Sequence, residues 1–351
     1  MSAADPKSFV PSASYALPGP RVIAPPRLDS DMSHVLSCWQ KLGGRGLQGL
    51  SVDAARALPS LVAASRAILR RTDDLGVDME PARITGAAGP LPARVYRRRA
   101  AARGGKAGAI LFFPGGGWVL GTLDAHDETC RALALRTGAV IIAVLPRQAP
   151  EHKFPAAHED ANALWAWLMR EAEGLGIDPH RCAVAGEGSG GNLALNVALF
   201  ARDTKGTGKL PPPVHVAMLT PVAGGGLDTP SHRDCGAALP LGTPGTKWLG
   251  QQVFEQTKQA YDKRIALALR ADLAGLPPVS LVLAEADPLR SDGEQLAQVL
   301  RRSGVRVTSS LYEGVTHDFF GLGQVVTKAA FAQGEVGMAL ALALDTDPRY
   351  I

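Results

Sequence analysis

Short runs of apolar and β-branched residues alternate with helical patterns through the last two thirds of the chain. Four segments have apolar residues at helical spacing, at 126–138, 156–176, 191–203 and 292–304. The runs expected to be strands lie at 109–113, 139–145, 182–185, 214–219, 280–286 and 307–312. Because nearly continuous apolar strands alternate with helices, the pattern predicts an α/β fold, with a mostly parallel central sheet and helices on both faces.

The first third of the chain has a different pattern. Residues 1–30 are rich in proline and are expected to be extended or poorly ordered. Segment 51–76 predicts one amphipathic helix, and segment 84–99, punctuated by Gly and Pro, predicts a hairpin of two strands. Segment 223–273 is Gly/Pro-rich and then helical. It interrupts the later alternation and is a candidate wall over a binding site.

Composition and charge narrow the class of protein. The chain has 351 residues, of which 46% are hydrophobic and 20% charged, as in an ordinary globular protein. A net charge of +4 gives no reason to expect a nucleic-acid partner. The densest basic cluster, 94–106, has no aromatic residue except Tyr96 and is expected to be a solvated strand end and loop.

Cysteine usage and the start of the chain predict a cytoplasmic protein. The cysteines form no C-x-x-C pair, which favours free thiols over a zinc site or disulfides; they are Cys38, Cys130, Cys182 and Cys235. The first residues have Pro and Ser where a signal peptide needs an apolar core. No stretch of about 18 apolar residues occurs, so we expect no membrane span.

Candidate chemistry follows the ends of the predicted strands, where ligands bind in such sheets. Three glycines, 115–117, follow the first of these strands and leave their backbone N–H groups unobstructed, as an oxyanion requires. The Gly-rich turn 186–191 opens a helix, whose N terminus favours negative charge. Asp287 and His317 each follow a later strand. The order Ser, Asp, His is that of the catalytic triad in α/β hydrolases.

Each of these features has an ordinary structural explanation when it is taken alone. Three glycines can form a flexible turn, Asp287 before a proline suits a turn or a helix cap, and His317 among aromatic residues can be structural. Their coincidence at the carboxyl ends of successive strands, in the order of a triad, favours an active site.

The chain resembles the hormone-sensitive-lipase-like carboxylesterases of the α/β-hydrolase fold from about Ile84 to Leu344. The resemblance rests on the segments LDAHDETCRALALRTGAVIIAV, APEHKFPAAHEDA, GIDPHRCAVAG, DPLRSDGE and YEGVTHDFFG. It implies an N-terminal extension and helical cap at 1–80 and a catalytic-type domain at 81–351, in which the candidate wall at 223–273 is a candidate second cap segment. It also implies a Ser-His-Asp triad, a His-Gly-Gly-Gly oxyanion loop, and no metal or organic cofactor.

The sequence departs from the family pattern where the nucleophile should be. The family's turn is Gly-Asp-Ser-Ala-Gly-Gly-Asn, and the corresponding residues here are Gly-Glu-Gly-Ser-Gly-Gly-Asn at 186–192. In an ungapped alignment Gly188 takes the place of the nucleophile, and Ser189 takes the next position. Pro114 replaces the histidine of the oxyanion loop, and Leu145-Pro146 replaces an Asp-Tyr pair.

The leading hypothesis is that the turn is displaced by one residue and Ser189 is the nucleophile. Ser189 then attacks a carboxylic ester of a short or medium acyl chain, His317 carries the proton, and Asp287 fixes the imidazole tautomer. The backbone donors to the oxyanion are then Gly115, Gly116 and Gly190, and in the undisplaced register the third donor is the N–H of Ser189.

Two alternatives remain open. In one, His317 and Asp287 transfer protons without a covalent step, in elimination, cyclisation or water-mediated hydrolysis. Some plant relatives of the family work as dehydratases or cyclases. In the other, the pocket only binds a small molecule, as in a plant hormone receptor of this family. In every case the expected partner is an ester or similar apolar ligand, and a homodimer is left open. The residues expected to line the pocket are Trp118, Gly188 and Phe319.

Overall fold

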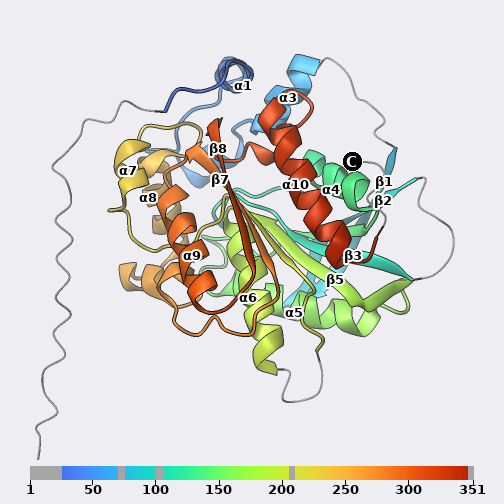
Figure 1. Cartoon of the computed structure of the whole chain (residues 1–351). Coiled ribbons are helices and arrows are strands. Elements are labelled where there is room, and N and C mark those ends of the chain that lie inside the picture. The colour runs from blue at the N-terminus through green and yellow to red at the C-terminus, as the bar shows by residue number, and fades with distance from the viewer. Residues whose placement is uncertain (1–25, 70–75, 100–105, 205–209, 347–351) are drawn as a thin grey trace, which may run out of the picture.

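A computed structural model of the chain describes residues 26–69, 76–99, 106–204 and 210–346 (Figure 1). The expectation of an extended segment at 1–30 therefore falls, up to residue 25, outside the described residues.

One sheet of eight strands forms the centre of the molecule, in the order β1-β2-β4-β3-β5-β6-β7-β8. The first two strands form an antiparallel hairpin, β2 pairs antiparallel with β4, and the remaining neighbours are parallel. The strands are β1 Val77–Gly86, β2 Gly89–Arg98, β3 Ala107–Phe113, β4 Val140–Val144, β5 Ile177–Glu187, β6 Val216–Leu219, β7 Val279–Ala286 and β8 Val307–Thr316. The six predicted strands, the hairpin and the mostly parallel sheet are confirmed. The expected domain boundary at residue 80 falls inside β1.

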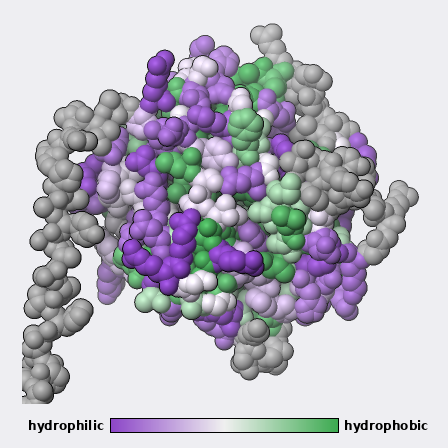
Figure 2. Space-filling view, viewed as in Figure 1, coloured by the Kyte–Doolittle hydropathy of each residue, from purple (hydrophilic) through white to green (hydrophobic). Residues whose placement is uncertain are grey.

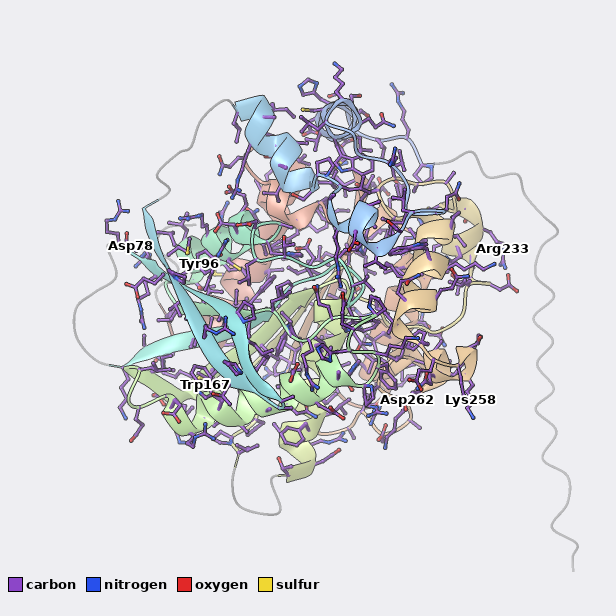
Figure 3. All side chains as sticks on the ribbon, turned by 180° about the vertical axis from the view of Figure 1, so that it is seen from behind. Asp78, Tyr96, Trp167, Arg233, Lys258 and Asp262 are labelled. Atoms are coloured by element: carbon purple, nitrogen blue, oxygen red, sulfur yellow. The ribbon has the colours of Figure 1, made fainter. Side chains whose placement is uncertain are left out.

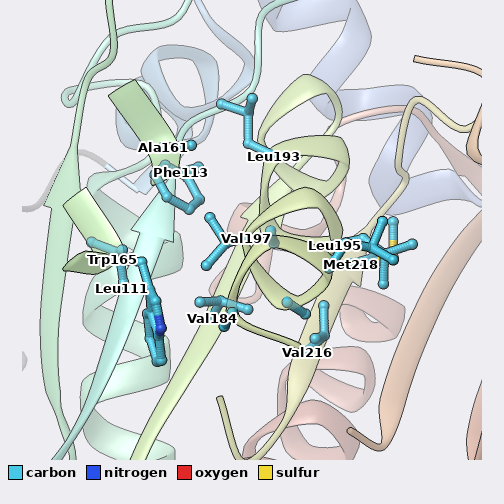
Figure 4. Close-up of a cluster of buried hydrophobic side chains, with 14 of the residues drawn as sticks. Leu111, Phe113, Ala161, Trp165, Val184, Leu193, Leu195, Val197, Val216 and Met218 are labelled. Carbon is cyan, nitrogen blue, oxygen red and sulfur yellow. The ribbon is translucent and has the colours of Figure 1, made fainter. Parts of the chain in front are cut away.

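Helices cover both faces of the sheet because the strands carry apolar side chains on each of its two faces. Leu111 and Phe113 of β3 pack in one core with Trp165, and Figure 4 shows this cluster. Ile110 and Phe112 belong to the opposite core. The helices that contribute to the first core are α5 Ala156–Glu171, α6 Ser189–Thr204 and α9 Arg290–Arg302. The second core is formed with α4 Asp127–Thr137, α10 Thr327–Ala343 and the N-terminal helices α1 Ser30–Lys41 and α3 Leu61–Leu69.

The N-terminal part of the described chain forms three helices: α1 Ser30–Lys41, α2 Val52–Arg56 and α3 Leu61–Leu69. The prediction of one helix over 51–76 is wrong, because α2 ends before Pro59 and α3 begins after it. Residues 70–75 lie outside the described part. In Figure 1, α1 and α3 stand near the end of the sheet where the arrow of β8 terminates.

Segment 223–273 forms two α-helices and two 3₁₀ helices at one side of the sheet (Figure 1). They are α7 Pro230–Asp234, α8 Gly242–Val253 and the 3₁₀ helices η2 Thr257–Tyr261 and η3 Leu267–Leu269; a further 3₁₀ turn, η4 Phe320–Leu322, follows β8. Arg233 and Lys258 stand on the outer side of this segment (Figure 3).

The surface is mixed in character. On the face shown in Figure 2, hydrophobic residues form separate patches between hydrophilic ones. Within the described residues, no helix has both the length and the apolar composition needed to cross a membrane.

Candidate active site

The turn between β5 and α6 places Gly188 opposite the histidine of the site. Gly188 has a φ of +53°, a left-handed conformation that favours glycine. A Cβ atom added to Gly188 would lie 3.5 Å from Nε2 of His317. The position that faces the imidazole therefore belongs to a residue without a side chain.

Two other glycines of the turn explain this register. A Cβ on Gly186 would lie 2.2 Å from the carbonyl of Gly190, and a Cβ on Gly190 would lie 1.9 Å from the carbonyl oxygen of Phe113. A turn displaced by one residue would bring the side chain of Glu187 to the position that Gly186 now occupies against the helix. The displaced register that the leading hypothesis requires is thus not the one in the structure, and the reason is steric.

Ser189 is the first residue of α6 and is buried. Its Oγ accepts a hydrogen bond from the backbone N–H of Trp118 at 3.2 Å. Within the described chain no hydrogen bond joins Ser189 to His317. The nucleophilic role of Ser189 stays a prediction, and this geometry does not favour it.

Asp287 and His317 follow β7 and β8 directly, and the sheet brings them together. Nδ1 of His317 lies 2.8 Å from Oδ2 of Asp287, so a proton on Nδ1 leaves Nε2 free to face Gly188. On the other side of the ring, Oδ1 of Asp318 lies 3.3 Å from Nε2. Burial lowers the pKa of His317, but the carboxylates of Asp287 and Asp318 outweigh it and raise the pKa to about 10.

Glu187 adds a buried acid that the sequence-based prediction missed. The residue is 2% exposed, its Oε2 accepts a hydrogen bond from Oγ1 of Thr129 at 3.3 Å, and its Oε1 has no partner among the described residues. Burial, together with the charge of Asp318, raises the pKa of Glu187 to about 8. The available signal was the glutamate at a position where the family has aspartate.

The expected oxyanion donors need correction. The N–H of Gly115 donates to Nε2 of His126 at 2.9 Å, and so it is not free to hold an oxyanion. The carbonyl of Thr122 accepts from Nδ1 of the same ring at 3.0 Å, which fixes the tautomer of His126. Nothing in the sequence had marked His126 for this role.

Other backbone N–H groups of the two turns remain available. Gly116 and Gly117 follow β3 with positive φ, and no hydrogen bond from their N–H groups occurs within the described residues. Ser189 begins α6, so its N–H has no carbonyl partner inside the helix. Gly116, Gly117 and Ser189 are therefore candidate donors to an oxyanion, whereas Gly115 is not. The donor role expected of Gly190 stays a prediction.

A cavity of about 810 Å³ opens beside these groups. Its wall includes Trp118, Ser189 and His317, but not Gly188. Apolar side chains from the N-terminal region and from segment 223–273 complete it, among them Leu58, Leu61, Leu241 and Leu249. Trp118 therefore lies where the sequence predicted. The expectation for Phe319 is wrong, because its ring is fully buried and packs 5.5 Å from that of Tyr312 in the core.

A family model described as the α/β hydrolase fold matches residues 110–321. The chain belongs to the α/β hydrolase family. The resemblance stated from the sequence is thereby confirmed, and the eight-stranded sheet is the one on which this family builds its sites.

Several relatives of this α/β hydrolase have names that describe an activity. An ethyl acetate hydrolase of Pseudomonas putida is 35% identical over 239 residues, which cover 68% of this chain and 74% of that protein. The carboxylic ester hydrolase LipN of Mycobacterium tuberculosis is 34% identical over 303 residues, covering 84% and 78%.

Solved structures of esterases are similar to this chain over most of its length. A thermostable esterase from Pseudomonas putida has a TM-score of 0.80 and 30% identity, with 92% of this chain and 99% of that chain covered. The esterase of the archaeon Pyrobaculum calidifontis has a TM-score of 0.78 and 31% identity, with 90% and 98% covered.

Proposed function

We propose that this α/β hydrolase cleaves carboxylic esters of a short or medium acyl chain, and that His317 activates a water molecule for the attack. The class of reaction is supported by the ester hydrolases to which the chain is 34–35% identical in sequence and by an esterase structure of the same architecture. The observation that carries the mechanism is the position of Gly188. Its Cβ position lies 3.5 Å from Nε2 of His317, where the family pattern has a serine.

The proposed reaction proceeds in two steps. In the first, the water oxygen bonds to the acyl carbon while one water proton passes to Nε2 of His317, and Asp287 holds the resulting imidazolium through Nδ1. The carbonyl oxygen becomes an oxyanion next to the N–H groups of Gly116, Gly117 and Ser189. In the second step the bond to the alcohol oxygen breaks, the proton on Nε2 passes to that oxygen, and the carboxylic acid and the alcohol leave.

The absence of a side-chain nucleophile sets the expected rate. Removing members of a serine triad costs on the order of 10⁴ to 10⁶ in rate, while the oxyanion donors and substrate binding alone retain about 10³ to 10⁴ over water. We therefore expect slow ester hydrolysis that depends on His317. A covalent route through Ser189 would require its hydroxyl to leave the Trp118 N–H and approach His317.

Turnover of p-nitrophenyl butyrate by three forms of the full chain tests this proposal. The wild type should release nitrophenol without an initial burst, because no acyl-enzyme accumulates. His317→Ala should lower the enzyme-dependent rate by roughly 10² or more, because the general base is lost while the oxyanion donors remain. Ser189→Ala should lose less than about tenfold, since its backbone N–H stays and only the hydrogen bond to Trp118 disappears. A rate that is independent of His317 would contradict ester hydrolysis, and a rate abolished in Ser189→Ala would contradict the water route.

A further inference from the structure

His232 presents an unused hydrogen-bond acceptor to the cavity. The residue belongs to α7, is 4% exposed and forms part of the cavity wall. Thr243 Oγ1 donates to the carbonyl oxygen of His232 at 2.8 Å, so the same hydroxyl must accept the hydrogen bond of 2.9 Å from Nδ1 of the ring. The proton of the neutral ring is therefore on Nδ1. Nε2 carries a lone pair, is buried, and has no partner among the described residues.

Asp292 presents a second acceptor in the same wall. It lies in the first turn of α9 and is 5% exposed. Neither of its carboxylate oxygens makes a hydrogen bond or an ion pair with any residue that the structure describes. Burial, with the nearby charge of Asp287, raises the pKa of Asp292 to about 6, so the group is still mostly ionised at neutral pH.

A pair of serines holds these two residues near one another. The N–H of Ser231 donates to Oγ of Ser291, and the N–H of Ser291 donates to Oγ of Ser231, both at 3.0 Å. His232 follows Ser231 in α7, and Asp292 follows Ser291 in α9. The reciprocal contact between the two serines therefore joins the helices one residue before each acceptor. Gly224 also lines the cavity, and a Cβ there would lie 2.2 Å from Oδ1 of Asp292. Any larger residue would press on the carboxylate.

We propose that His232 and Asp292 form a subsite for a primary ammonium group carried by an otherwise apolar ligand. Nε2 of His232 and the carboxylate of Asp292 both accept hydrogen bonds and carry no hydrogen at neutral pH, and the remainder of the wall is largely apolar. A hydroxyl offers one hydrogen, whereas a primary ammonium offers three and also compensates the charge of Asp292. The identification of this ligand as the substrate, an amino-substituted ester, rests on the proposed function.

Binding measurements on the full chain test the subsite without any turnover. The probes are n-hexylamine, hexyltrimethylammonium and 1-hexanol, compared by titration calorimetry at neutral pH. The second has the charge without the N–H donors, and the third has one donor without the charge. We expect n-hexylamine to bind at least about tenfold more tightly than either control. Equal dissociation constants for n-hexylamine and hexyltrimethylammonium would overturn the proposal, and so would tighter binding of 1-hexanol.

A pair of variants locates the effect. Asp292→Asn keeps the shape of the side chain and removes its charge, and it should bring n-hexylamine to within about threefold of 1-hexanol. Glu294→Gln, on the exposed side of the same helix, removes an equal charge outside the cavity and should leave the preference intact. An unchanged preference in Asp292→Asn would overturn the assignment. Because none of these constants depends on catalysis, failure of ester hydrolysis and failure of the subsite give separate results.

Discussion

Gly188 and its neighbours determine the chemistry of the site at the scale of single residues. The family pattern already placed Gly188 at the nucleophile's position, and Asp287 and His317 at the ends of two strands. The register of the turn could not be predicted from the sequence, because it depends on a contact between distant segments. A Cβ on Gly190 would lie 1.9 Å from the carbonyl oxygen of Phe113 in β3. For the same reason the hydrogen bond of His126 to Gly115 was not foreseen.

The protonation of His317 gives a prediction about pH. A base must be unprotonated, and the pKa of His317 is raised to about 10 by its two neighbouring carboxylates. The value of kcat/KM for p-nitrophenyl butyrate should therefore rise with pH through the neutral range and level off only above about pH 10. A pH–rate profile measured after subtraction of the spontaneous hydrolysis checks this expectation.

Asp318→Asn supplies the comparison for that profile. The negative charge of Asp318, 3.3 Å from Nε2 of His317, stabilises the imidazolium. Because the change removes this charge, the pKa of His317 should fall. The rising limb of the profile should move to lower pH while Asp287 still holds the ring. An identical profile in the variant would show that Asp318 does not control the protonation of the base.

At the scale of elements, regular patterns were easier to predict than packing. The strands and the four predicted helices appear because their apolar periodicity is strong. α1 and α10 were not predicted. In α10 apolar residues occur on all sides, since one side packs on the sheet while Phe331 and Leu342 remain exposed. Pro59 separated α2 from α3 in a segment whose spacing alone suggested one helix.

The contact between the start of α6 and β3 gives a prediction about stability. Gly190→Ala places a methyl group 1.9 Å from the carbonyl oxygen of Phe113, so the helix and the strand must separate. The free energy of unfolding should fall by about 3 kcal/mol or more in denaturant titrations. Gly46→Ala is the matched control because no atom lies within 4 Å of its Cβ position, and it should change the free energy by less than about 1 kcal/mol. Equal effects of the two changes would contradict the packing described.

At the scale of the whole molecule, the N-terminal helices and the catalytic loops form one cavity. Arg56 of α2 connects them: its Nε donates to the carbonyl of Val119 at 3.0 Å, and one terminal nitrogen donates to the carbonyl of Ala149 at 3.0 Å. The other terminal nitrogen pairs with Glu151 at 2.6 Å. The sequence suggested a cap but could not indicate this contact, because its partners are 63 to 95 residues away.

The contact of Arg56 predicts a change in substrate binding. Arg56→Met removes the hydrogen bonds while retaining much of the side chain's length, so α2 should become less firmly held over the cavity. KM for p-nitrophenyl butyrate should rise about fivefold, with kcat changed by less than about twofold, because the reacting groups stay in place. Lys106→Met, which breaks only the surface pair with Glu173, should leave both constants unchanged. A fall in kcat alone would contradict this role.

The central claim is that residue 188, and not residue 189, faces the base. The most direct measurement is mass spectrometry after treatment with a fluorophosphonate, on the wild type, Gly188→Ser and Gly188→Ala. The account predicts one adduct on residue 188 of Gly188→Ser, because its Cβ lies 3.5 Å from Nε2 of His317, and none on the other two proteins. An adduct on Ser189 of the wild type would contradict it.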